Sequence, residues 1–187
     1  MSQPQSNCQC QMCEAEATTG LGHDSYMCSI ADRVRRNGWA VPTVFGDETG
    51  PPWAYTVGIW HTYGGPELAM FGGPVEGMMG IINSIGRRIA EGAMVGVGDQ
   101  LDDACGYPLA IRPVHLSWRM TSMFAVSDSF YGWVRPACLQ VVWPDRGSRF
   151  PWEPGFDPAF EGDQPFLWLP RDDHPPGSWT RLDGPPG

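Results

Sequence analysis

Residues 53–72, WAYTVGIWHTYGGPELAMFG, are the stretch that decides the fold. Residues 53–60 and 66–72 are rich in β-branched and aromatic side chains, a composition that favours strands. Between them, HTYGG (61–65) has the length and the glycines of a hairpin loop. The stretch therefore predicts two neighbouring antiparallel strands, 53–60 and 66–72.

A helix is expected to follow these strands directly. In PVEGMMGIINSIGRRIAEG (74–92), apolar residues recur at helical spacing, Pro74 suits a first helical turn, and Gly92 can end the helix. The sequence further predicts a helix from Asp24 or Ser25 to Asn37, a strand over 39–45 at a sheet edge because of Pro42, strands over 108–116 and 138–145, and a helix or turn over 120–132. This order predicts a single α+β domain, with an antiparallel or mixed sheet packed with two to three helices.

Three segments are expected along the chain. Residues 1–22 form a polar, cysteine-bearing N-terminal extension, and residues 23–169 form the α+β domain. Residues 170–187 are rich in proline, glycine and acidic residues, which predicts a disordered C-terminal tail.

Composition limits the classes of partner. The 187 residues carry a formal net charge of −9 and no lysine, and this acidic balance argues against a nucleic acid as partner. No run of 18 apolar residues is present, and the N-terminus lacks the basic and apolar regions of a secretory signal. We therefore expect a cytoplasmic protein that does not interact with membranes and whose thiols stay reduced.

The N-terminal segment SNCQCQMC (6–13) places Cys8, Cys10 and Cys13 within six positions. Zinc takes four thiolate or imidazole ligands, so a fourth ligand, either Cys28 or His23, would complete a structural site. Two alternatives remain open from the residues: a disordered tail with free thiols, or a disulfide. Zinc is the cofactor that this spacing suggests.

Several motifs taken together resemble one family. PPWAYTVGIWHTYGGPELAMFGGP (51–74), a following helix with IIN, and LQVVWPDRGSRFPWEPGF (139–156) are similar to the bacterial and phage family known as domain of unknown function 4262. The resemblance runs from about Arg35 to Leu167 and implies a short cysteine-bearing N-terminus, but no activity. The order of YTVG, PEL, a helix, PLAI and LQVV is also similar to the Suppressor-of-fused-like superfamily, which implies a role in protein binding or immunity.

Two functions from different classes follow. The first is a non-catalytic binding module with an unknown protein partner, immunity-like or phage-borne, because no Ser-His-Asp order, HExxH motif or phosphate loop is present. The second is a small enzyme with an acid–base pocket around His61, Glu67, Asn83 and Asp145. In the alternative reading, Asn83 and Gln140 satisfy buried backbone groups, and Glu67 caps a turn or pairs with Arg87 or Arg88. The candidate binding residues are Tyr55, Trp60, His61, Glu67, Asn83, Asp145, Trp152 and Gln164.

Overall fold

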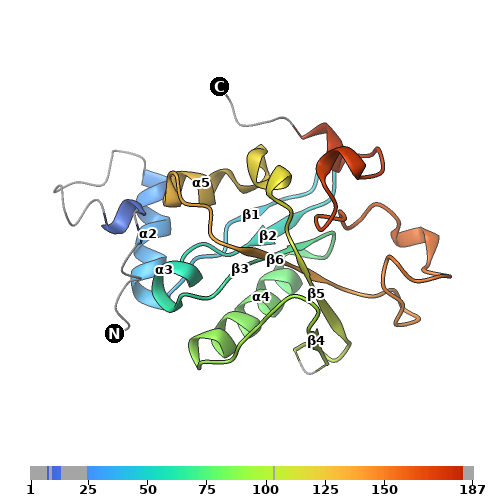
Figure 1. Ribbon diagram of the computed structural model, residues 1–187, viewed down its shortest axis with the longest axis horizontal. Coiled ribbons are helices and arrows are strands. Elements are labelled where there is room, and N and C mark those ends of the chain that lie inside the picture. Colours follow the sequence, from blue (N-terminus) through green and yellow to red (C-terminus); the bar gives the residue numbers. More distant parts are fainter. Residues whose placement is uncertain (1–7, 9, 14–24, 103, 183–187) are drawn as a thin grey trace.

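The computed structural model describes residues 8, 10–13, 25–102 and 104–182 of the chain (Figure 1). Six strands form one mixed sheet in the order β1-β2-β3-β6-β5-β4, in which only β3 and β6 run parallel. The strands are β1 (Thr43–Val44), β2 (Trp53–Tyr55), β3 (Glu67–Phe71), β4 (Gln100–Leu101), β5 (Leu109–Pro113) and β6 (Cys138–Val142). The helices are α2 (Ser25–Asn37), α3 (Ile59–Tyr63), α4 (Val75–Ala90) and α5 (Ala125–Tyr131). The expected α+β fold with a mixed sheet is confirmed.

Both faces of the central strands are covered, and a large core lies on each face (Figure 1). Along β3, Leu68 and Met70 face α4, whereas Ala69 and Phe71 face the opposite core with α2 and α5. Alternate residues of a strand point to opposite faces, which is why every residue of β3 and β6 is buried. These two strands form the centre of the sheet, and the two-residue strands β1 and β4 form its edges.

The predicted helices and strands occur near the expected positions. The helix expected over 74–92 is α4, whose Met78, Ile82, Ile85 and Ile89 are buried. The edge strand expected over 39–45 is reduced to β1 after Pro42 and a bridge between Ala40 and Val57. The segment 120–132 forms a short 3₁₀ turn, η2 (Ser122–Phe124), followed by α5.

The predicted hairpin differs in one respect. Strands β2 and β3 do pair antiparallel, with Trp53 opposite Phe71, but β2 ends at Tyr55. The helix α3 replaces the end of the expected strand and the first part of the expected loop. Gly58 has a φ of 115°, a left-handed conformation that terminates the extended chain and begins the helix. A Cβ at Gly58 would lie 2.8 Å from a methyl group of Val34, so the close approach of α2 also requires glycine.

The expectation of a disordered tail over residues 170–187 is wrong for the residues that the structure describes. Residues 170–182 include two short 3₁₀ turns, η4 (Arg171–Asp173) and η5 (Trp179–Arg181). Trp179 is only 3% exposed and packs edge-on against Trp53 and Phe71. One large aromatic side chain thus anchors a segment whose average composition is typical of disorder, while residues 183–187 lie outside the described part.

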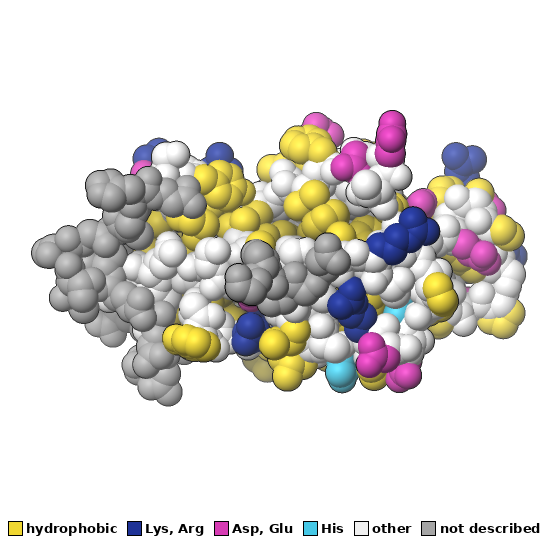
Figure 2. All heavy atoms as spheres, turned by 90° about the horizontal axis from the view of Figure 1, so that it is seen from above, with side chains coloured by type: hydrophobic (Ala, Val, Ile, Leu, Met, Phe, Trp, Pro, Cys, Tyr) yellow, Lys and Arg dark blue, Asp and Glu magenta, His cyan; other side chains and the backbone are white. Residues whose placement is uncertain are grey.

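The described residues of the N-terminal extension also pack on the domain. Residues 11–13 are helical, and the buried Cys10 and Met12 join the core that contains α2. Within the described residues, no helix is long and apolar enough to cross a membrane. In the view of Figure 2, hydrophobic side chains gather in the middle of one face, with charged side chains of both signs scattered around them.

Replacing Trp179 with alanine tests the anchoring of the C-terminal segment. Because Trp179 fills a buried site, and because its Nε1 donates a hydrogen bond of 2.7 Å to the Gly162 carbonyl, Trp179→Ala should lower the free energy of unfolding by about 3–5 kcal/mol. Urea unfolding followed by circular dichroism measures this. Trp133, which is 94% exposed, provides the control: Trp133→Ala should change the stability by less than about 0.5 kcal/mol. Equal effects of the two variants on stability would show that Trp179 does not anchor residues 170–182 to the domain.

Candidate metal centre

Four soft ligand atoms meet at one end of the sheet. The Sγ atoms of Cys8, Cys10 and Cys13 lie 3.3, 3.2 and 3.7 Å from Nδ1 of His61, and the Sγ atoms of Cys10 and Cys13 are 3.8 Å apart. All four ligand atoms lie within 4.8 Å of one another. Cys10 and His61 are buried, and Cys8 and Cys13 are half-buried.

These spacings fit a tetrahedral zinc site. Zinc–sulfur bonds of about 2.3 Å and zinc–nitrogen bonds of about 2.0–2.1 Å, at tetrahedral angles, separate two sulfur atoms by about 3.8 Å and sulfur from nitrogen by about 3.6 Å. A disulfide would instead need two sulfur atoms about 2.05 Å apart. All six cysteines lie among the described residues and none forms a disulfide, so the cluster is suited to a metal ion rather than to a covalent bridge.

The electrostatics of the thiols favour a cation. A hydrogen bond from the Cys10 thiol lowers the pKa of Cys8, whereas that same bond, together with burial, raises the pKa of Cys10 to about 12. Closely spaced thiols cannot all ionise without a compensating positive charge, because each thiolate disfavours the next. A bound metal ion supplies that charge and holds the thiols as thiolates.

The fourth member of the cluster is His61 rather than the expected Cys28 or His23. Cys28 lies on α2 outside the four-residue cluster, and His23 lies outside the described residues. His61 is 48 to 53 residues away from the three cysteines, on the helix α3 that the sequence did not predict. The composition of HTYGG predicts a loop, and no spacing rule links this segment to the N-terminal cysteines.

A buried carboxylate positions α3. Glu67, at the start of β3, is 1% exposed, and its Oε1 accepts hydrogen bonds from the backbone N–H groups of Gly58 (3.0 Å) and Trp60 (3.1 Å) and from the Tyr131 hydroxyl. Its Oε2 accepts a bond of 2.5 Å from the Thr56 hydroxyl. Glu67 therefore caps the first turn of α3, which confirms the alternative that it caps a turn, and its oxygens are fully used.

One protein-family model matches this chain. A family model described as "Domain of unknown function (DUF4262)" matches residues 33–157, about two thirds of the chain. The chain belongs to the DUF4262 family. The match includes His61 and Glu67 but not the three N-terminal cysteines. No curated protein and no solved structure matches this DUF4262 chain, so the likeness to the Suppressor-of-fused superfamily stays a prediction.

The structure does not gather the four residues of the expected acid–base pocket into one set of contacts. In this DUF4262 protein His61 joins the cysteines, and Glu67 is saturated by donors from α3, α5 and Thr56. Asn83 accepts a hydrogen bond from the Trp39 indole on the opposite face of the sheet. Asp145 accepts bonds from the backbone N–H groups of Gly147, Arg149 and Asp157, which lowers its pKa and orders the loop after β6.

The remaining predicted binding residues have structural contacts. The hydroxyl of Tyr55 accepts from the Val126 N–H, and Trp60 packs edge-on against Tyr131. Both amide atoms of Gln164 bond the backbone of Trp143. Gln140 bonds the backbone of Pro165 and Leu167 in the same way, which confirms the interpretation that it satisfies buried backbone groups.

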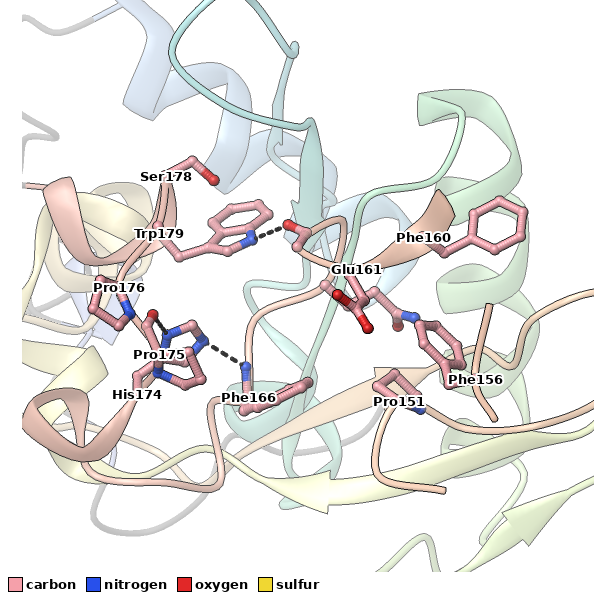
Figure 3. Close-up of a pocket in the computed structure, with 13 residues that line it drawn as sticks. Pro151, Phe156, Phe160, Glu161, Phe166, His174, Pro175, Pro176, Ser178 and Trp179 are labelled. Carbon is pink, nitrogen blue, oxygen red and sulfur yellow. Dashed lines mark hydrogen bonds between the residues drawn. The ribbon is translucent and has the colours of Figure 1, made fainter. Parts of the chain in front are cut away.

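Trp152 is the most accessible of the predicted aromatic residues. It is 37% exposed and stacks on Phe150, with the Arg112 guanidinium 4.0 Å from its ring centroid. An aromatic cleft of about 500 Å³ lies nearby, between the segments 151–166 and 174–179 (Figure 3). Phe156, Phe160, Phe166 and Trp179 line it together with three prolines, while His174 bonds the Phe166 N–H and is thereby fixed in its wall.

Replacing Glu67 with glutamine tests the cap. An amide NH₂ in place of Oε1 would face three donors, and an amide oxygen there is a weaker acceptor than a carboxylate oxygen, so Glu67→Gln should lower the free energy of unfolding by about 2–3 kcal/mol in urea titrations. Tyr131→Phe removes one donor and leaves the cap, so its effect should be smaller. The exposed Glu48 supplies the matched control, Glu48→Gln, for which no measurable change is expected. A Glu67→Gln variant as stable as the control would show that the carboxylate does not hold α3.

Proposed function

We propose that this protein is a non-catalytic binding module with a structural zinc ion held by Cys8, Cys10, Cys13 and His61. The observation that carries the proposal is the convergence of three sulfur atoms and one imidazole nitrogen within 4.8 Å. Thiolate and imidazole ligands in tetrahedral arrangement favour zinc over magnesium or calcium, which require oxygen ligands.

The number of ligands supports a structural rather than a catalytic metal. A catalytic zinc ion has three protein ligands and keeps a position for water or substrate, whereas four protein ligands complete the coordination. The carboxylate nearest in sequence to His61, Glu67, is bound to backbone and hydroxyl donors and has no free oxygen for proton transfer. Both facts favour binding over catalysis.

The metal would fasten the N-terminal segment to the domain. Cys10 and Met12 already contact the core with α2, and the metal would join this segment to α3 on the other side. Three thiolate ligands persist in a reducing compartment, so a cytoplasmic location is part of the proposal. The immunity-like or phage-borne role and the protein partner rest on the family resemblance alone.

Metal analysis of the purified chain tests the site. Protein prepared without chelator should contain one zinc ion per chain by mass spectrometry, and the Cys10→Ser and His61→Ala variants should lose it, because each removes one ligand. Cys28→Ser is the matched control and should retain the metal. Substitution by Co²⁺ should give the visible absorption of a tetrahedral thiolate site in the parent protein and in Cys28→Ser only.

Two results would contradict the proposal. Protein without bound metal, which also fails to take up Zn²⁺ or Co²⁺ after reduction, would show that the cluster is a set of packed thiols. Loss of metal in Cys28→Ser with retention in His61→Ala would show that the site uses the ligand expected from the sequence.

A further inference from the structure

A second cleft, of about 450 Å³, lies between the C-terminal part of α2 and α4. Arg33 and Asn37 of α2, Asn83 and Arg87 of α4, and Trp39 and Met79 are among its lining residues. The lining contains two arginines and no acidic residue. In a chain with a net charge of −9, such a grouping of positive charge is a local feature that composition does not explain.

The two guanidinium groups are available for a ligand. Among the described residues, the side chains of Arg33 and Arg87 have no hydrogen-bond or ion-pair partner, whereas Arg35 and Arg36 on the same helix as Arg33 both pair with Asp32. An arginine presents five N–H donors in a planar fork that matches the oxygen atoms of a phosphate or carboxylate. Two arginines from different helices can therefore hold one anionic group from two sides.

The side chain of Asn83 adds a directed donor. The indole Nε1–H of Trp39 can only donate, so the atom that it contacts at 2.9 Å must be Oδ1 of Asn83. This leaves the Asn83 NH₂ group without an acceptor among the described residues. The orientation of this amide is thus fixed by the indole, with its donor side left for another partner.

Trp39 itself is held in place and forms an apolar floor. Its ring lies against α4 at Gly86, where a Cβ would be 3.0 Å from two ring atoms, and it packs edge-on against Tyr63. Trp39 and Val41 are each 8% exposed, and Met79 is half-buried beside them. The cleft therefore combines two arginines with an apolar floor. Small-molecule sites typically join an apolar lining to a few polar or charged groups that orient the ligand.

We infer that this cleft binds a small ligand that carries a phosphate or carboxylate group on a flat apolar body. The anionic group lies between Arg33 and Arg87 and accepts from the Asn83 amide, and the apolar body covers Trp39 and Met79. Salt screens charges that lie more than about 8–10 Å apart. The distant acidic surface therefore does not cancel the attraction of the two nearby arginines for an anion. This ligand class belongs to the proposed binding module, but none of the cleft residues is a metal ligand, so the two proposals can fail separately.

Nuclear magnetic resonance on the full chain tests the cleft. Phenyl phosphate and benzoate are the anionic probes, phenol is the neutral one, and the indole N–H signal of Trp39, assigned with Trp39→Phe, is the reporter. At least one anion should shift this signal saturably with a Kd in the millimolar range or tighter, while phenol should not. Tighter binding of phenyl phosphate assigns a phosphate ligand, and tighter binding of benzoate assigns a carboxylate.

Charge-matched variants separate the cleft from a general charge effect. Arg33→Gln/Arg87→Gln should weaken anion binding at least tenfold, and Asn83→Ala should weaken it less. Arg36→Gln/Arg88→Gln removes the same charge from the same two helices, outside the cleft lining, and should leave the Kd within twofold. Absence of saturable binding of both anions, or equal weakening in the two double variants, would overturn the inference. Zinc content measured on the same samples shows whether the metal proposal stands independently.

Discussion

The buried carboxylate of Glu67 is the interaction on which the local structure depends. It lies where β3 begins, and it accepts hydrogen bonds from α3, from Tyr131 of α5 and from Thr56 at the end of β2. A buried charge without such partners costs several kcal/mol, so the network is stable only when every donor is in place. One side chain therefore holds three elements together. Because Glu67 fixes the direction of α3, it also determines the position of His61 on that helix.

This arrangement explains why the chain turns into a helix within an apparent hairpin. The apolar and aromatic residues of 53–60 favour a strand, but a strand would leave Glu67 buried beside β2 without amide donors. Ending β2 at Tyr55 turns the N–H groups of Gly58 and Trp60 toward the carboxylate. The hydrogen bonds to the buried carboxylate outweigh the local preference of residues 56–60 for an extended chain. Gly58 permits the turn into α3, because glycine adopts a positive φ at little cost.

The sequence predicts the parts of the fold that depend on local patterns of apolar residues. The helix α4 follows from apolar residues at helical spacing, whereas the central strands β3 and β6 follow from short apolar runs, because both of their faces are buried. The metal cluster was predicted in its three cysteines but not in His61, since that contact joins residues 48 to 53 positions apart and depends on α3. The order of residues 170–182 was missed because a single buried ring, Trp179, outweighs an average composition that favours disorder.

The division of the site between the family domain and the N-terminal extension indicates what a bound metal would do. His61 and its support by Glu67 lie inside the DUF4262 match, whereas the three cysteines precede it. The imidazole is therefore held by the domain before any metal binds, and the ordering cost of binding falls mainly on the N-terminal segment. Metal binding would link residues 48 to 53 positions apart and so close a long loop. This link would reduce the conformational entropy of the detached N-terminal segment and thereby stabilise its attachment to the domain. The sheet has a large core on each face, so a bound metal would control where the cysteine-bearing segment 8–13 lies rather than whether the domain folds.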